Sequence, residues 1–245
     1  MLLAMPIHMP VSRLKSSARE RIGSAFDPET RHLVKQVRER RITFLKPDAL
    51  LGLHRRVRSL ERSGVPGVII EAGTALGGSA VVLAAAKAPT RPLHVYDVFD
   101  MIPPPGDRDG KDVWDRYEII TTGGAEGFAG DTYYGYQRDL RSKVAQAFVE
   151  FGFPLETNAV SLHEGLFEDT LHPDQPVALA HIDGDWYSSV RTCLDRIWPV
   201  LVPGGVLVID DYGSWSGATD AVDDFLCTIT GYHLEQWARL HIVRT

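Results

Sequence analysis

The segment His181-Ile182-Asp183-Gly184-Asp185-Trp186 ends an apolar run that begins with Val177-Ala178-Leu179-Ala180. A second apolar run, Gly205-Val206-Leu207-Val208-Ile209, ends in Asp210-Asp211. Near-continuous apolar runs of this length are typical of parallel strands that are buried on both faces. Open sheets of such strands bind ligands outside the carboxyl ends of the strands. The sequence therefore predicts a parallel sheet with four carboxylates along its ligand-binding edge.

Four carboxylates at one sheet edge favour a metal site. Like charges a few ångströms apart repel one another strongly in a low-dielectric environment unless a cation lies between them. Oxygen ligands are the ones that hard divalent cations prefer. We therefore expect Mg²⁺ or a similar divalent cation at this edge.

Helical and strand patterns alternate through most of the chain. Asp27-Pro28-Glu29 and Lys46-Pro47-Asp48 are typical helix starts. The alternation predicts a doubly wound α/β sheet, with residues 1–65 as an N-terminal helical extension and residues 66–245 as the main domain. We expect helices at 28–41, 47–63, 78–87, 136–151, 188–200 and 219–230, strands at 68–71, 93–97, 160–163, 177–182 and 206–209, and a terminal antiparallel hairpin of 232–236 with 241–244.

Residues 99–135 interrupt this alternation. They contain Ile102-Pro103-Pro104-Pro105-Gly106 and a glycine-rich run that extends to Gly135. Loops of this length inside a compact domain are usually functional lids or binding loops. Six aromatic residues from Trp114 to Tyr136 favour a lid insertion that covers a substrate, although a surface insertion without a role is the alternative.

Composition and charge exclude several classes of protein. The chain has 245 residues, a net charge of −6 and 44% hydrophobic residues, which suits one globular domain. Residues 1–65 hold 14 Lys and Arg against 6 Asp and Glu, but these charges alternate with apolar residues as on a solvated helix face. We expect no nucleic-acid partner and no membrane span. Residues 1–12 are expected to be disordered. Their apolar run is too short for a secretory leader, which predicts a cytoplasmic protein. Cys193 and Cys227 are expected to be reduced core residues.

A second ligand site is expected where the first strand of the main domain ends. Glu71-Ala72-Gly73-Thr74-Ala75-Leu76-Gly77-Gly78-Ser79 joins that strand to a helix, and glycines there let backbone N–H groups approach a ligand. Asp97 ends the next strand, where a carboxylate can accept hydrogen bonds from ribose hydroxyls. The loop lacks the G-x-G-x-x-G dinucleotide pattern, and Glu71 suits a ligand with positive charge, such as S-adenosylmethionine.

Five ordered motifs in residues 66–245 resemble those of the macrocin O-methyltransferase family. They are Glu71-x-Gly73-x-x-x-Gly77-Gly78-Ser79, Val95-Tyr96-Asp97-x-Phe99, Gly165-x-Phe167-x-Asp169-Thr170-Leu171, Asp183-Gly184-Asp185-x-Tyr187-x-Ser189, and Pro203-Gly204-Gly205 through Asp210-Asp211-Tyr212. The resemblance implies a Rossmann-like class I methyltransferase fold, with a mostly parallel seven-stranded sheet. It also implies S-adenosylmethionine and Mg²⁺ as cofactors, and methylation of sugar or phenol hydroxyls in antibiotic or polysaccharide biosynthesis. More distantly, the layout resembles catechol O-methyltransferase.

The resemblance also implies roles for individual residues. By this resemblance, Asp183, Asp210 and Asp211 are expected to bind the metal. Asp185 is expected to be the general base for a different reason, which is that its side chain lies beyond the metal ligand on the side from which the acceptor approaches. Cofactor contacts are expected from Glu71, Ala72, Gly73, Thr74, Ser79, Asp97, Gly165, Leu166 and Asp183.

Several residues keep a structural alternative. Asp185 could instead cap the following helix, and Asp211 could support a ligand rather than bind the ion. His181 is expected to be a core residue, because strand alternation points it away from the carboxylates. His163 is also expected to be structural, and Trp186 and Tyr187 could stack on a sugar or simply pack.

Other functions remain as alternatives to a small-molecule glycoside methyltransferase. A phenolic or catechol acceptor needs similar machinery. A metal-dependent hydrolase or phosphotransferase is disfavoured, because Glu71-Ala72-Gly73 offers neither a phosphate-loop lysine nor an aspartate nucleophile. A binding module without activity is disfavoured because all four carboxylates are present. We also expect a dimer to which residues 28–63 contribute, the alternative being that these residues pack on their own sheet.

Overall fold

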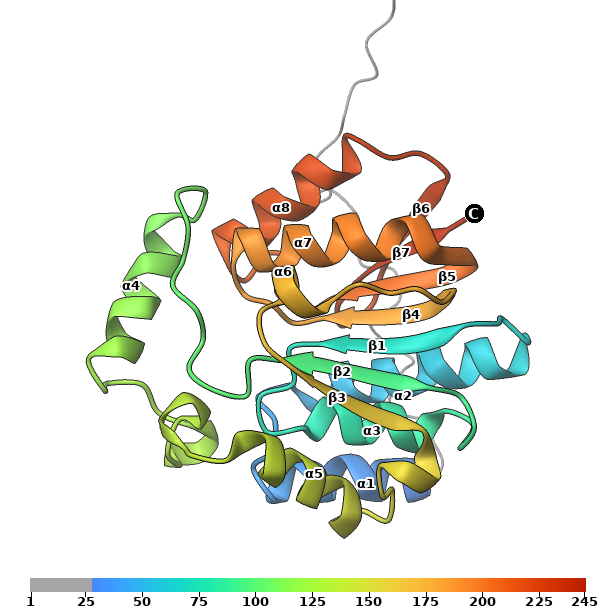
Figure 1. Cartoon of the computed structure of the whole chain (residues 1–245), viewed down its shortest axis with the longest axis horizontal. Coiled ribbons are helices and arrows are strands. Elements are labelled where there is room, and N and C mark those ends of the chain that lie inside the picture. The colour runs from blue at the N-terminus through green and yellow to red at the C-terminus, as the bar shows by residue number, and fades with distance from the viewer. Residues whose placement is uncertain (1–27) are drawn as a thin grey trace, which may run out of the picture.

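A seven-stranded sheet forms the centre of the protein in this computed structural model, which describes residues 28–245 (Figure 1). The strand order is β3-β2-β1-β4-β5-β7-β6, and β7 pairs antiparallel with both β5 and β6. The predicted doubly wound sheet with a terminal antiparallel hairpin is confirmed. The strands are β1 (Val68–Ala72), β2 (Leu93–Asp97), β3 (Val160–Glu164), β4 (Val177–Ile182), β5 (Leu201–Ile209), β6 (Tyr232–Gln236) and β7 (Leu240–Arg244).

Helices cover both faces of the sheet, and each face has its own apolar core. The helices are α1 (Pro28–Glu39), α2 (Pro47–Arg62), α3 (Gly78–Ala86), α4 (Lys111–Thr121), α5 (Leu140–Glu150), α6 (Phe167–Thr170), α7 (Tyr187–Ile197) and α8 (Ser216–Leu226). One core joins α1, α2, α3 and α5 to one face, and the other joins α7 and α8 to the opposite face. Successive strand residues alternate between the two cores: Ile69 enters the first, and Ile70 enters the second.

Helices α1 and α2 are part of the first core. Val37, Leu50, Leu53 and Val57 are each no more than 1% exposed and belong to the same apolar cluster as Ile69 of β1. The apolar stripe of this helical pair is therefore buried within the chain itself. The predictions for residues 1–12 lie outside the described residues.

The prediction of an unbroken loop over residues 99–135 is wrong in one respect, because this insertion contains α4. Its buried residues Val113 and Ile120 are seven apart, which is two helical turns. With Ile102, Tyr133 and Trp186 they form a third, smaller apolar cluster beyond the carboxyl ends of the parallel strands (Figure 1). The insertion thus carries a small core of its own.

Tertiary contacts move the ends of other elements. Helix α8 begins at Ser216 because Asp112 of α4 accepts hydrogen bonds from its backbone N–H (2.9 Å) and its hydroxyl. The helix ends at Leu226, so Cys227 lies beyond it and is exposed, which corrects the prediction of a core cysteine. Helix α5 likewise begins at Leu140, four residues after the predicted start, and β5 begins at Leu201, five residues before it.

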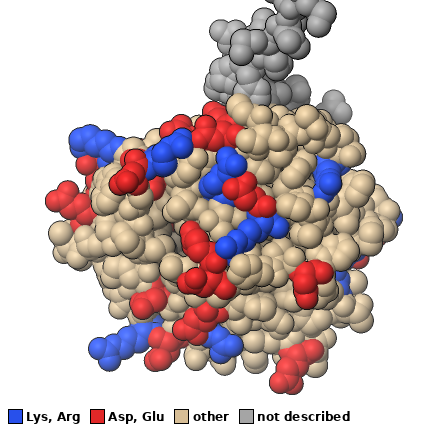
Figure 2. Space-filling view, turned by 45° about the horizontal axis from the view of Figure 1, so that its top comes forward, with Lys and Arg blue, Asp and Glu red and all other residues tan. Residues whose placement is uncertain are grey.

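Acidic and basic side chains are interspersed on the face shown in Figure 2. Within residues 28–245, no helix combines the length and apolar character needed to cross a membrane.

Candidate active site

A cavity of about 330 Å³ lies at the carboxyl ends of β1, β2, β4 and β5. Its walls come from the loops that follow these strands, from the insertion 99–135, and from Phe44 and Leu45 between α1 and α2. The glycine loop after β1 lines one part, and the predicted carboxylates line another. One pocket therefore joins the two sites that the sequence predicts separately.

The glycine loop passes very close to the end of β4. Gly73 has a φ of +88°, and a Cβ atom at this position would overlap the carbonyl oxygen of Asp183. Thr74 is next to it, lines the cavity and is 4% exposed, and its hydroxyl has no hydrogen-bond partner among the described residues. Buried polar atoms normally have partners, so this hydroxyl marks a place where a polar ligand would fit.

Asp97 holds the glycine loop in place. Its Oδ2 accepts hydrogen bonds from the backbone N–H groups of Thr74 (2.7 Å) and Ala75 (3.0 Å), and its Oδ1 accepts one from Phe99 (2.8 Å). Burial raises the pKa of Asp97, and these three N–H donors oppose that shift. The carboxylate lines the cavity while it also orders the loop.

Glu71 and Ser79 lie under the loop and do not line the cavity. The Ser79 hydroxyl donates to Oε1 of Glu71, and Nδ1 of His181 donates to Oε2 at 2.9 Å. Glu71 and His181 are both fully buried. Of the other predicted cofactor residues, Leu166 and Asp183 line the cavity, whereas Ala72 and Gly165 do not.

Asp183, Asp185 and Asp211 form a cluster in which one oxygen of each carboxylate lies within 4.8 Å of the others. Burial and the neighbouring carboxylates raise the pKa of Asp183 and of Asp211 well above the usual range. Burial and the charge of Asp210 raise the pKa of Asp185 to about 7. Like charges this close together repel one another, which favours a divalent cation as their partner.

Asp210 is in a different electrostatic environment. Arg239 binds both of its oxygens, with Nε 2.5 Å from Oδ1 and Nη2 3.2 Å from Oδ2, and Nε2 of His181 lies 3.6 Å from Oδ1. Burial alone would raise the pKa of Asp210, but His181 and Arg239 outweigh burial and lower it. Burial likewise opposes protonation of His181, but Glu71 and Asp210 outweigh it and raise the pKa of His181 to about 10.

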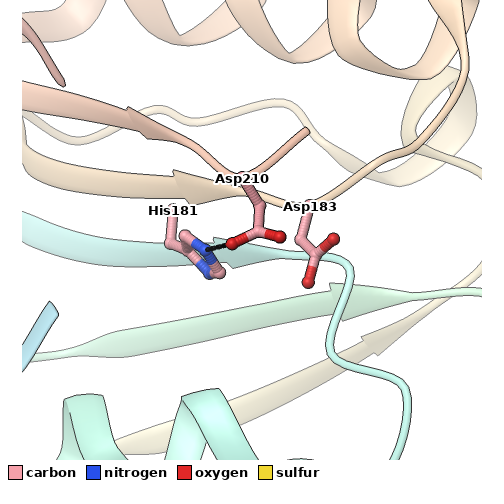
Figure 3. Close-up of side chains that lie close together, drawn as sticks. All are labelled: His181, Asp183 and Asp210. Carbon is pink, nitrogen blue, oxygen red and sulfur yellow. Dashed lines mark ion pairs between the residues drawn. The ribbon is translucent and has the colours of Figure 1, made fainter. Parts of the chain in front are cut away.

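The prediction for His181 is only half right. The residue is fully buried, as expected of a core residue, but its ring lies against Asp210 and does not point away from the carboxylates (Figure 3). A protonated imidazole has no lone pair for a metal, so His181 serves as a counter-ion in this arrangement. The remaining donors are all carboxylate oxygens, which is the set that Mg²⁺ prefers.

The geometry also resolves alternatives for neighbouring residues. Asp185 does not cap α7, because the first backbone N–H of that helix, that of Tyr187, donates to Asp109 instead (2.8 Å). The indole N–H of Trp186 donates to the carbonyl of Pro103 (2.9 Å), and Trp186 packs in the core of the insertion. Nε2 of His163 lies 3.2 Å from Nδ1 of His94, and the His163 ring stacks on Tyr96.

The sequence did not indicate three other residues of the cavity wall. Arg116 of α4 lines the cavity near Asp185 and lies 5.6 Å from the Tyr133 ring centroid. Phe44 meets Tyr134 edge to face at 6.3 Å, and Arg239 reaches the carboxylates from the turn between β6 and β7. If the helix at 111–121 is recognised, Arg116 lies three residues after the apolar Val113, on a neighbouring part of the same helix face. No local pattern indicates the positions of Phe44 and Arg239.

Comparison with known proteins gives a consistent picture. The model of the macrocin-O-methyltransferase (TylF) family matches residues 5–229. A demethyldecarbamoylnovobiocin O-methyltransferase of Streptomyces niveus is 29% identical over 172 residues, which cover 66% of this chain and 59% of the relative. A tetracenomycin-type rhamnosyl 4'-O-methyltransferase of Streptomyces olivaceus is 30% identical over 179 residues, which cover 69% of this chain and 61% of the relative. The chain thus spans about three fifths of the length of these relatives.

Solved structures share the fold. The O-methyltransferase NovP superposes with a TM-score of 0.68 at 22% identity, over 83% of this chain and 82% of NovP. The calicheamicin methyltransferase CalS11 superposes with a TM-score of 0.61 at 18% identity, over 89% of this chain and 93% of CalS11. Because the family model covers most of the sequence, the chain belongs to the macrocin O-methyltransferase (TylF) family.

Proposed function

We propose that this protein transfers a methyl group from S-adenosylmethionine to a hydroxyl of a sugar in a small glycoside. One observation carries the proposal: a single cavity joins the glycine loop after β1 to the carboxylate cluster after β4 and β5. A methyl donor at the loop and an acceptor hydroxyl at the carboxylates would then meet in one pocket. The relatives named above act on natural products, one of them on a rhamnosyl group.

The loop side of the cavity would hold the methyl donor. Thr74 offers the unpaired hydroxyl, Gly73 allows close approach of the backbone, and Asp97 keeps the loop in shape while it presents a carboxylate to the ribose. Leu166 and Phe44 add apolar surface to this side. Glu71, Ala72, Ser79 and Gly165 would act from beneath the loop or beside it.

The acidic side of the cavity would hold the acceptor hydroxyl. Asp183, Asp210 and Asp211 are the proposed ligands of Mg²⁺, which when bound lowers the pKa of a hydroxyl and orients its oxygen. The fit rests on the carboxylate oxygens that converge there, and on burial together with the neighbouring carboxylates, which raise the pKa of Asp183 and Asp211.

Asp185 would accept the proton of the acceptor hydroxyl. With a pKa of about 7, its carboxylate is near the value at which a base combines sufficient deprotonation with sufficient basicity at neutral pH. A hydrogen bond from Trp215 holds this carboxylate, and Arg116 faces it from the lid. The aromatic wall of Tyr133 and Tyr134 would exclude water and cover the apolar face of a sugar.

An acceptor screen with isotopically labelled S-adenosylmethionine tests the proposal. We expect label transfer to glycosides, with loss of transfer in excess chelator and recovery when Mg²⁺ is restored. Transfer only to catechols would replace the sugar acceptor with a phenolic one. Full activity in chelator would remove the metal from the proposal, and the absence of transfer to any hydroxyl acceptor would overturn it.

Association into a dimer is a further part of the proposal. Its support is the basic surface of the N-terminal helices against the acidic remainder of the chain. Light scattering at micromolar concentration should give the mass of a dimer, and a monomer mass would contradict it.

A further inference from the structure

Asp210 differs from the other three carboxylates of the site because it already has a cation on each oxygen. Arg239 binds it through Nε and Nη2 in the two-pronged geometry that matches a guanidinium to a carboxylate. The side chain of Asp210 is only 9% exposed and that of Arg239 24%, so solvent screens this pair weakly. Asp183 and Asp211 make no ion pair with a Lys, Arg or His of residues 28–245.

The lone pairs of Asp210 limit what it can offer to a metal. A carboxylate has about four lone-pair positions. Arg239 uses one on each oxygen. Nε2 of His181 lies 3.6 Å from Oδ1, too far for a hydrogen bond, and has no hydrogen-bond partner among the described residues. While Arg239 stays in place, Asp210 therefore has about one lone-pair position left on each oxygen to offer an ion.

The turn between β6 and β7 fixes the position of Arg239. The backbone N–H of Trp237 donates to the backbone carbonyl of Arg239 (3.0 Å). The Trp237 ring contacts both the guanidinium of Arg56, 4.0 Å from its ring centroid, and the ring of His241, with the two ring centroids 4.6 Å apart. Arg56 in turn donates to Nδ1 of His241 (3.1 Å) and pairs with Glu235. Helix α2 thus holds the turn against the hairpin, with Arg239 directed toward the site.

We propose that Arg239 is a positioning residue that orients Asp210, uses half of the lone pairs that this carboxylate could offer to the metal, and weakens metal binding. The inference rests on the proposed function, since it concerns the metal of that site. A guanidinium next to a divalent ion repels it, and it also competes for the same carboxylate oxygens. In the metal-free protein the same guanidinium offsets part of the repulsion among four clustered carboxylates. Arg239 therefore makes the metal-free state more stable and the ion easier to exchange.

Variants of Arg239 separate these effects from a merely structural role. Arg239→Met removes both the positive charge and the two-pronged hydrogen bonding to Asp210, whereas Arg239→Lys keeps the charge but not the two-pronged geometry. Arg191→Met is the matched control, because Arg191 pairs with Asp195 one turn along α7 and lies outside the site. Mg²⁺ and Mn²⁺, each alone, are titrated calorimetrically into the chelator-treated full chain, and thermal unfolding is followed with and without metal.

We expect Arg239→Met to bind Mg²⁺ at least about tenfold more tightly than the parent. Changing a group that contacts a metal ligand usually alters metal affinity by about tenfold or more. Here the affinity should rise and not fall, because the group that is removed is a cation. Its metal-free form should melt at a lower temperature, and added metal should raise its Tm by more than it raises the parental Tm. Arg239→Lys should fall between the two, and Arg191→Met should match the parent. If Arg239→Met does not fold, Arg239→Lys provides the same comparison.

Unchanged or weaker metal binding in both Arg239 variants, with normal binding by the parent, would overturn the inference and leave the proposed function intact. A parent that binds neither ion would overturn the inference as well. Labelled methyl transfer in the presence of chelator would then show whether the methyltransferase proposal survives without its metal.

Discussion

Gly73 shows how much one position near the cavity constrains the chain. Its positive φ and its approach to the Asp183 carbonyl exclude any side chain there. We predict that Gly73→Ala lowers the free energy of unfolding by more than 2 kcal/mol, roughly the sum of left-handed strain and a steric overlap. Urea unfolding measures this, and cofactor binding should weaken in parallel.

Gly123 provides the control, since it has a φ of +80° but nothing within 4 Å of a Cβ. Gly123→Ala should cost only the backbone strain, about 1–2 kcal/mol. Equal losses in the two variants would mean that the contact with Asp183 contributes nothing.

The proposed base and the proposed ligands should separate by mutation. We predict that Asp185→Asn lowers the methyl-transfer rate by roughly 10²–10⁴, the usual contribution of a positioned base, and leaves metal affinity nearly intact. Asp183→Asn or Asp211→Asn should weaken metal affinity, so that added Mg²⁺ partly restores turnover. Kinetics at several Mg²⁺ concentrations measure both effects, with exposed Asp115→Asn as the control. An Asp185→Asn enzyme with the parental rate would contradict the assignment.

Metal binding should depend on pH because the ligands must lose protons. Burial and the neighbouring carboxylates raise the pKa of the proposed ligands Asp183 and Asp211 well above the usual range. Below these values protons compete with the ion, so affinity should rise with pH, up to about tenfold per unit for each proton released. Calorimetry in two buffers of different ionisation enthalpy counts the protons. Affinity that is constant from pH 6 to 8 would refute the prediction.

The insertion 99–135 behaves as a structured element because separate contacts attach it to the body. Asp112 holds the first residue of α8, and Arg41 of the N-terminal extension pairs with Asp131 (2.8 Å). Arg38 lies 3.9 Å from the ring centroid of Phe128. These contacts hold both ends of the insertion over the cavity.

Asp112 should therefore stabilise the start of α8 as well as the insertion. We predict that Asp112→Ala lowers the free energy of unfolding by about 1 kcal/mol, the usual value for losing a helix cap, and raises KM for the acceptor more than it lowers kcat. Chemical denaturation and steady-state kinetics measure the two effects. Asp115→Ala, which removes an exposed pair with Lys111, should leave the free energy of unfolding nearly unchanged, because solvent screens such pairs. If Asp112→Ala and Asp115→Ala had equal effects, Asp112 of α4 would not be acting as the cap of α8.

At the scale of the whole molecule, the N-terminal helices are required for the first core. Val37, Leu50, Leu53 and Val57 are among their buried residues, and each contributes about 1.5–3 kcal/mol of burial. Their sum is comparable to the total stability of a domain, about 5–15 kcal/mol. We predict that a chain lacking residues 28–63 shows no cooperative thermal transition by circular dichroism. A cooperative melt in this truncated chain would show that the sheet is stable without the extension.

The amino-acid sequence alone determined the sheet and the positions of its carboxylates. Apolar runs and helix start signals are local patterns, and strands that end in Asp97, Asp183 and Asp210 meet at one edge of any parallel sheet. The sequence also indicated the glycine loop, because its glycines lie directly between a strand pattern and a helix pattern.

Only the tertiary structure decided which of these carboxylates face a cation and where some elements begin. Arg239 lies 29 residues from Asp210, Asp112 lies 104 residues from Ser216, and Glu71 lies 110 residues from His181. Each of these contacts depends on which residues lie close together in space. A local sequence pattern contains no information on that distance. For the same reason α4, whose buried face packs against other parts of the insertion and against Trp186 and Trp215, was not predicted from the sequence.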